Sequence, residues 1–161
     1  MNFDHALERS QWAPSNLEDI FHFFSDASNL EVLTPPWLRF QILSPQPIAM
    51  SVGALIDYRL NWRGIPLRWQ TKIIQWEPPN IFEDWQMNGP YRLWHHIHTF
   101  ESIDGGTLIS DRVRYALPFG LLGQAVHALT VRAGVNAIFD YRSAKVCELF
   151  GCDARVQRRR S

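Results

Sequence analysis

Three histidines lie within four positions of the segment Tyr91–Glu101: His95, His96 and His98. Imidazole titrates near neutral pH and binds metal ions, so such a group can move protons, hold a metal or supply hydrogen bonds inside a protein wall. The rest of the segment is largely aromatic and apolar. This composition is typical of a β-strand.

Strand parity decides which of the histidines can share a site. Successive side chains of a strand point to opposite faces, so His96 and His98 lie on one face and His95 on the other. We predict that the inward face is the one with two large aromatic rings: Trp94, His96, His98 and Phe100. Leu93 and Ile97 then lie outside, where they form a modest apolar patch or a dimer contact.

The next predicted strand, Thr107–Leu117, carries an acidic residue on its apolar face. Arg112 and Arg114 belong in water, so the alternate residues point inward: Ile109, Asp111, Val113 and Tyr115. A buried carboxylate needs a charge partner or hydrogen-bond donors. Asp111 is therefore expected to meet the two inward histidines. Arg142, in an apolar part of the last predicted helix, is a second possible partner.

Three interpretations of this cluster stay open. It is a satisfied structural network that fixes strand register, a polar anchor for a ligand, or a catalytic or metal site. The candidate catalytic residues are His96, His98 and Asp111. An isolated His-x-His pair is a weak indication of a metal site, so we expect no metal and no cofactor. The sequence has no G-x-S-x-G elbow, P-loop or G-x-G-x-x-G turn, which argues against hydrolases and nucleotide-dependent enzymes.

The elements that position these residues follow from the hydrophobic period. A strand is predicted over Phe3–Trp12, and two short helices over Asn16–Ser25 and Asn29–Leu33, each begun by an S-x-x-E capping box at Ser15 and Ser28. From position 37 the period is two for about eighty residues, as in a half-buried antiparallel sheet with short turns. A long helix is predicted from residue 121 to residue 150, capped by Gly151.

This order of elements predicts an α+β fold. A curved seven-stranded antiparallel sheet must cover its apolar face, and the long C-terminal helix is the only element large enough to do so. We therefore expect the sheet to wrap around the helix, with the two short helices after the first strand closing one end. A ligand cavity is expected between sheet and helix.

Composition limits the class of protein. The chain of 161 residues has 16 basic and 16 acidic side chains, so no net charge draws it to nucleic acid. No signal-peptide pattern and no apolar stretch of about 18 residues is present, so we expect a cytoplasmic protein without an integral membrane segment. One domain is expected over residues 1–152, and residues 153–161 form a basic tail, which we expect to be disordered.

Several motifs, in this order and spacing, resemble those of the SRPBCC superfamily. They are Leu33-Thr34-Pro35-Pro36-Trp37, His96-x-His98-x-Phe100-Glu101, Gly105-Gly106-Thr107-Leu108, Asp111-x-Val113-x-Tyr115-x-Leu117-Pro118-x-Gly120 and Phe139-Asp140-Tyr141-Arg142. Within that START and Bet v 1-like superfamily, the chain is similar to the bacterial ligand-binding group related to polyketide cyclase/dehydrase-like proteins. The resemblance covers residues 1–150. It implies a helix-grip fold with an internal pocket for hydrophobic molecules.

The abundance of aromatic residues fits such a pocket: seven Trp, ten Phe and four Tyr. We predict that the ligand-binding wall consists of Tyr58, Trp62, Trp69, Trp94, His96, His98, Phe100, Asp111, Tyr115, Phe139 and Arg142. The favoured function is a non-catalytic carrier or sensor of a lipid, sterol or polyketide-like molecule, as a monomer or weak homodimer. The alternative is a cyclase/dehydratase-like enzyme that uses the His/Asp cluster without a nucleotide cofactor.

Overall fold

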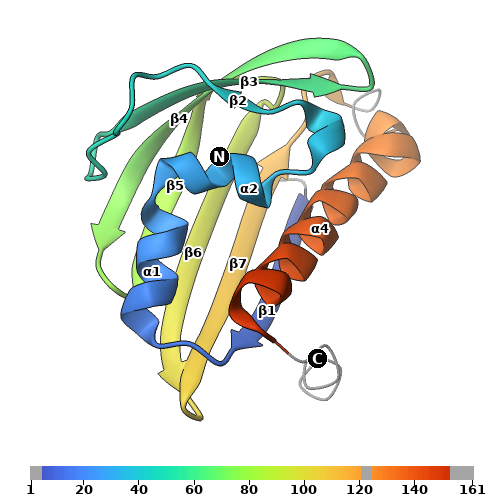
Figure 1. Cartoon of the computed structure of the whole chain (residues 1–161). Coiled ribbons are helices and arrows are strands. Elements are labelled where there is room, and N and C mark those ends of the chain that lie inside the picture. Colours follow the sequence, from blue (N-terminus) through green and yellow to red (C-terminus); the bar gives the residue numbers. More distant parts are fainter. Residues whose placement is uncertain (1–4, 121–124, 153–161) are drawn as a thin grey trace.

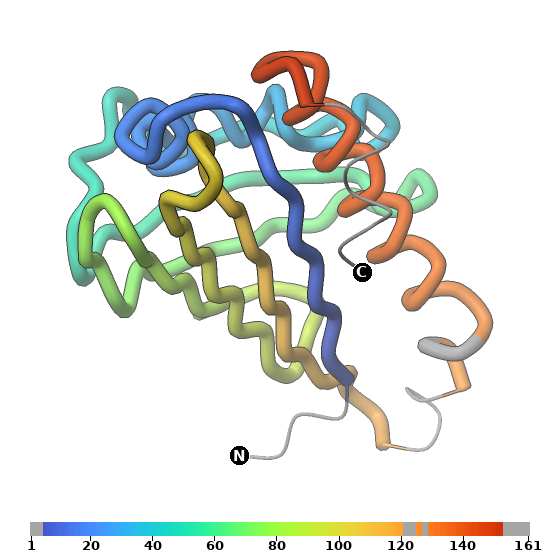
Figure 2. Tube along the Cα trace, turned by 90° about the horizontal axis from the view of Figure 1, so that it is seen from below, coloured from blue at the N-terminus to red at the C-terminus, as the bar shows by residue number. Residues whose placement is uncertain are grey.

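The computed structural model of the chain describes residues 5–120 and 125–152, and within them seven strands form one antiparallel sheet in the order β1-β7-β6-β5-β4-β3-β2. The strands are β1 His5–Ala13, β2 Gln41–Ile42, β3 Leu55–Trp62, β4 Ile65–Glu77, β5 Ile81–Asn88, β6 Leu93–Ile103 and β7 Gly106–Ala116. Strands β2 to β7 follow one another as a meander. Strand β1 closes the order beside β7, with Ser10 opposite Ser110 (Figure 2).

Helices cover the inner face of the curled sheet. Helix α1 is Leu17–Ser25 and α2 is Leu30–Leu33, with short 3-10 turns at Ala27–Asn29 and Pro36–Leu38. The long helix α4, Arg132–Phe150, follows a π-helical turn at His127–Val131 and ends at Gly151, which has a left-handed φ of 76°. Figure 1 shows α4 along one side of the curled sheet, with α1 and α2 on the same inner side. The predicted α+β helix-grip architecture is confirmed.

Three predicted boundaries fall outside the described residues: the start of the first strand at Phe3, the start of the long helix at residue 121, and the tail 153–161. The described part of the chain contains no helix that is both long and apolar enough to cross a membrane.

The two predicted capping boxes are wrong in detail. Asn16, not Ser15, caps α1, because its Oδ1 accepts a hydrogen bond from the Asp19 amide at 2.8 Å. At the next turn Asp26 accepts from the Ser28 amide at 2.9 Å, so Ser28 is capped rather than capping. Asn and Asp are as effective as Ser at this position, and the S-x-x-E pattern alone does not choose among them.

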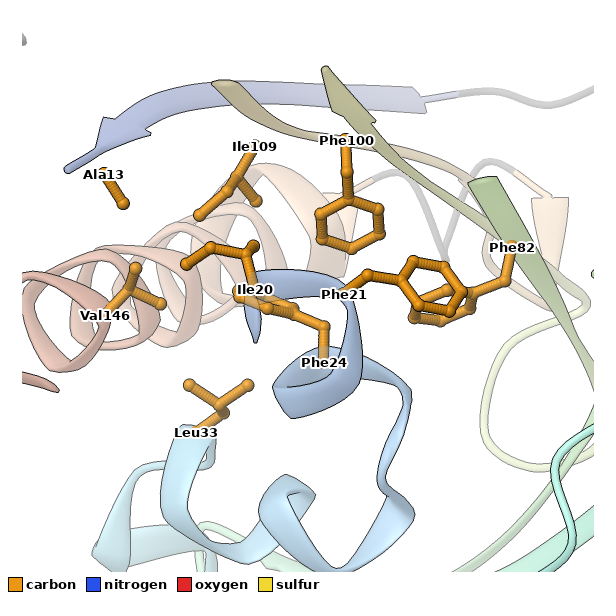
Figure 3. Packing of buried hydrophobic residues seen from close by; sticks show 9 residues of the cluster. All are labelled: Ala13, Ile20, Phe21, Phe24, Leu33, Phe82, Phe100, Ile109 and Val146. Carbon is orange, nitrogen blue, oxygen red and sulfur yellow. The ribbon is translucent and has the colours of Figure 1, made fainter. Parts of the chain in front are cut away.

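The hydrophobic core lies where α1 meets the ends of β5, β6 and β7. Figure 3 shows side chains converging from these elements and from β1, α2 and α4: Ala13, Ile20, Phe21, Phe24, Leu33, Phe82, Phe100, Ile109 and Val146. Phe21 makes edge-to-face contacts with Phe82 and Phe100, at ring-centroid distances of 6.0 and 5.5 Å. This packing closes one end of the space between helix and sheet and leaves the middle open.

Candidate functional site

A cavity of about 610 Å³ lies between the sheet and α4. Eight of the eleven residues predicted for the ligand-binding wall line it: Tyr58, Trp62, Trp69, Trp94, His96, His98, Phe139 and Arg142. Most of the other lining side chains are aliphatic or aromatic, among them Leu60, Leu67 and Ile138. The wall is therefore mainly apolar, with a few polar groups.

The remaining three predicted residues, Phe100, Asp111 and Tyr115, do not line the cavity. Phe100 is only 2% exposed because it is used in the α1 core. Tyr115 is buried in a second cluster with Val113, Val131, Val135 and Phe139. Asp111 lies behind the histidines. Strand parity correctly placed all three on the inner face but could not show which inward residues other side chains cover.

The aromatic part of the wall has few polar atoms free for a ligand. Trp69 stacks on Tyr58 at a ring-centroid distance of 5.9 Å and contacts Trp94 edge-on at 5.3 Å. The Trp69 indole donates to Thr71 Oγ1 at 3.1 Å, and the Tyr58 hydroxyl lies 3.3 Å from the same oxygen. Burial raises the pKa of the Tyr58 and Tyr91 phenols above the usual value. These groups are therefore neutral and present apolar faces.

The mouth of the cavity is marked by residues that both line it and are exposed. Ile65, Phe119 and Val126 are 60%, 81% and 45% exposed. They place the mouth between the β3–β4 turn and the beginning of the C-terminal helical segment.

A polar cluster interrupts the apolar wall on β5, β6 and β7. His96 and His98 are 6% and 4% exposed, which confirms their predicted inward orientation. Both rings contact one oxygen of Asp111: His96 Nε2 and His98 Nδ1 each lie 2.9 Å from Oδ1. The contact of His96 is a hydrogen bond, whereas that of His98 lacks hydrogen-bond geometry. The two imidazole rings are 3.7 Å apart at their centroids.

The sequence reasoning missed Asp84, which completes the cluster from β5. Its Oδ2 lies 3.2 Å from His98 Nε2 and 3.7 Å from His96 Nδ1. Register explains the contact, because Asp84 is directly opposite His96 in the sheet. A signal was present: Phe82, Asp84 and Gln86 alternate along one strand, which places the acid on the same face as a buried ring.

Arg142 brings a positive charge from α4, as predicted. Its Nη2 lies 3.9 Å from Asp111 Oδ1, and its guanidinium carbon is 5.1 Å from the centre of the Phe24 ring. The Nε atom of Arg142 is buried and has no hydrogen-bond partner within the described residues. Arg142 also lines the cavity, so a cationic group faces any occupant near the cluster.

Burial and charge set the protonation of the cluster. Burial opposes ionisation of Asp111, but Arg142 and the two histidines outweigh it and hold the pKa of Asp111 well below its usual range. Burial, assisted by the neighbouring His98, lowers the pKa of His96 to about 4. Burial also disfavours the charged form of His98, but the adjacent carboxylates of Asp111 and Asp84 outweigh it and raise the pKa of His98 above the usual value. A proton in this cluster therefore resides on His98 rather than on His96.

His95 lies on the other face of β6, as parity predicted. Its Nε2 is 2.7 Å from Glu83 Oε2, and its ring packs against Trp85 at 5.4 Å. It takes no part in the inner cluster.

Solved structures share this fold at low sequence identity. Ara h 8.0201 matches with a TM-score of 0.60 and 17% identity, over 89% of this chain and 98% of that protein. Major latex-like protein 151 from Panax ginseng matches with a TM-score of 0.66 and 8% identity, over 91% and 97%. Protein CV1439 from Chromobacterium violaceum matches with a TM-score of 0.71 and 12% identity, over 92% and 99%. No family model and no curated protein sequence matches the chain. These matches confirm the predicted fold of a curved antiparallel sheet around a long C-terminal helix.

Proposed function

We propose that this protein binds a hydrophobic small molecule in the cavity between the sheet and α4, as a carrier or sensor. The observation that carries the proposal is a cavity of about 610 Å³ with a mainly apolar wall and one polar cluster. Small-molecule sites typically occupy about 300–1,000 Å³ and combine apolar walls with a few convergent polar groups. A lipid, a sterol or a polyketide-like molecule meets this description.

The arrangement of the wall supports one orientation of the ligand. Trp62, Trp69 and Trp94 offer ring faces to an apolar body. Asp84, His98 and Arg142 offer hydrogen-bonding groups to a hydroxyl, keto or carboxylate end. Unpaired polar ligand atoms are costly in an apolar cavity, so the polar end belongs at the cluster.

A blocking substitution tests the proposal. Leu60 lines the cavity from β3, whereas Leu55 on the same strand is 47% exposed and does not line it. Fatty acids, sterols and polyketides would be titrated by displacement of an environment-sensitive fluorophore. We expect Leu60→Trp to lower the affinity at least tenfold and Leu55→Trp to leave it unchanged. Failure of the wild-type protein to bind any class, or equal binding by both variants, would contradict the proposal.

A cyclase/dehydratase-like activity is the second candidate, and the accessible imidazoles favour it. His96 and His98 line the cavity and contact carboxylates, an arrangement that can transfer protons to a bound ketone or alcohol. Asp111 does not reach the cavity and would act only through the histidines. Turnover of a poly-β-keto substrate should fall by at least 100-fold in His98→Gln. Turnover that persists in this variant would remove the candidate.

A further inference from the structure

The four side chains of the polar cluster form two layers. Each imidazole has one nitrogen near Asp111 and the other near Asp84. Asp84, His96 and His98 line the cavity, whereas Asp111 lies behind the rings and does not. The nitrogens that point towards Asp84 are His96 Nδ1 and His98 Nε2, and they converge on the same carboxylate oxygen.

We propose that Asp84, His96 and His98 form a binding site for a divalent transition-metal ion. The ligand atoms are a carboxylate oxygen of Asp84, Nδ1 of His96 and Nε2 of His98. One ligand atom from each of these three residues lies within 4.8 Å of the other two. This site does not depend on the proposed hydrophobic ligand, and either proposal can fail without the other.

The distances between the ligand atoms suit a metal of zinc size. Metal–nitrogen and metal–oxygen bonds of about 2.1 Å at angles of 90–110° separate neighbouring ligand atoms by roughly 3.0–3.4 Å. The two separations from Asp84 Oδ2 are 3.2 Å to His98 and 3.7 Å to His96. The third separation, between His96 Nδ1 and His98 Nε2, is within 4.8 Å, so the two imidazoles must turn towards each other for the three atoms to close around one ion.

Asp111 supplies the support that metal-bound histidines usually have. A ligating imidazole commonly donates its second N–H to a carboxylate, which fixes the tautomer and the orientation of the ring. Here His96 Nε2 makes such a hydrogen bond to Asp111 Oδ1 at 2.9 Å, and His98 Nδ1 lies at the same distance from that oxygen without hydrogen-bond geometry. Arg142 lies behind that carboxylate at 3.9 Å and compensates its charge. Asp111 is therefore a positioning residue in this proposal, not a ligand.

Charge and burial also favour a cation. With a proton on His98, the two carboxylates and one guanidinium leave no net charge. Metal binding displaces that proton, and the ion compensates the net charge of −1 that remains when both imidazoles are neutral. The side chains of Asp84, His96 and His98 are only 15%, 8% and 5% exposed. A buried negative charge of this kind is stabilised by a bound cation. Two imidazoles and one carboxylate select Zn²⁺, Fe²⁺ or Co²⁺ over Ca²⁺ and Mg²⁺.

The remaining coordination positions face the cavity, because all three ligand residues line it. Three protein ligands with open positions are typical of metals that bind exogenous molecules rather than of closed structural sites. The further ligand of the metal is therefore water or an oxygen-bearing group of a molecule in the cavity.

Titration with Co²⁺ tests the site, because its visible absorption reports the geometry and the ligands of the bound ion. The protein would carry Cys147→Ser and Cys152→Ser, since both thiols lie near Gln11 and could bind metal on their own. Asp84→Asn and His98→Gln keep the side-chain volume and remove a ligand. His95→Gln is the matched control on the outer face of the same strand.

We expect one Co²⁺ per chain, displaced by Zn²⁺, with affinity at least 100-fold weaker in Asp84→Asn and His98→Gln and unchanged in His95→Gln. Zn²⁺ should raise the unfolding temperature of the parent and the His95→Gln protein but not of the other two, which also shows whether each variant is folded. No visible absorption at millimolar Co²⁺, or equal affinity in the folded His98→Gln protein, would overturn the proposal.

Discussion

At the scale of single residues, adjacent histidines of one strand make contacts on opposite faces of the sheet. His95 bonds to Glu83 on the outer face, and His96 contacts Asp111 on the inner face. Period-two parity predicted this division and placed Asp111 on the inner face, where Arg142 of the helix was a second possible partner. It did not find Asp84, because the alternation along β5 indicates only that this acid shares a face with Phe82, and the register of β5 against β6 is what brings it to the histidines.

Removing the charge of Asp111 should destabilise the fold. Asp111→Asn leaves Arg142 buried without a full compensating charge, and breaking a buried ion pair costs about 3–5 kcal/mol. The free energy of unfolding would be measured by urea denaturation. Glu8→Gln is the control, since Glu8 of β1 pairs with Arg112 of β7 as an exposed cross-strand pair and such pairs contribute about 1 kcal/mol or less. Equal losses of unfolding free energy in the two variants would mean that the Asp111–Arg142 pair contributes no more to stability than an exposed ion pair.

At the scale of elements, α4 packs closely against β3 at Gly134, because this residue has no side chain. A Cβ atom at this position would lie 1.9 Å from the tip of the Trp62 ring. A lone glycine inside a helical pattern indicates from sequence no more than a place where the helix could bend. The hydrophobic period of the helix shows which of its residues face inward. It does not show that a ring from a strand packs directly on one of them.

Gly134→Ala should therefore displace Trp62, a residue of the cavity wall. Helix propensity alone would stabilise the variant by about 1 kcal/mol. Because the indole must move, we expect a shift in tryptophan emission and a several-fold change in ligand affinity. The double variant Gly134→Ala, Trp62→Phe has no large ring at this place. It should therefore show the increase in stability that helix propensity predicts. An emission spectrum and affinity identical to wild type in Gly134→Ala would show that the contact has no influence on the cavity.

At the scale of the whole molecule, the order of the elements was enough to predict the fold. A strand, two short helices, a meander and a long helix can bury one sheet face only by wrapping it around that helix. The extent of the cavity could not be predicted, because it depends on which inward side chains are buried in the hydrophobic clusters and so do not reach the cavity. Phe100 and Tyr115 are buried in this way, whereas Trp69 and Trp94 line the cavity.

The position of the mouth predicts how a ligand enters. Ile65 and Phe119 both line the cavity and are exposed apolar groups, so an apolar ligand can contact them before it is enclosed. Phe119→Asp should slow association several-fold in stopped-flow fluorescence. Met87→Asp is the control, because Met87 is 53% exposed and does not line the cavity. Equal rates in the two variants would place the entrance elsewhere.

The central claim, a hydrophobic molecule held between sheet and helix, is tested most directly by native mass spectrometry of the untagged protein purified under mild conditions. We predict an added mass, or its appearance after incubation with a lipid, sterol or polyketide mixture, in the wild type and in Leu55→Trp. The added mass should be absent in folded Leu60→Trp. A wild-type protein that remains at the mass of the bare chain throughout would contradict the claim.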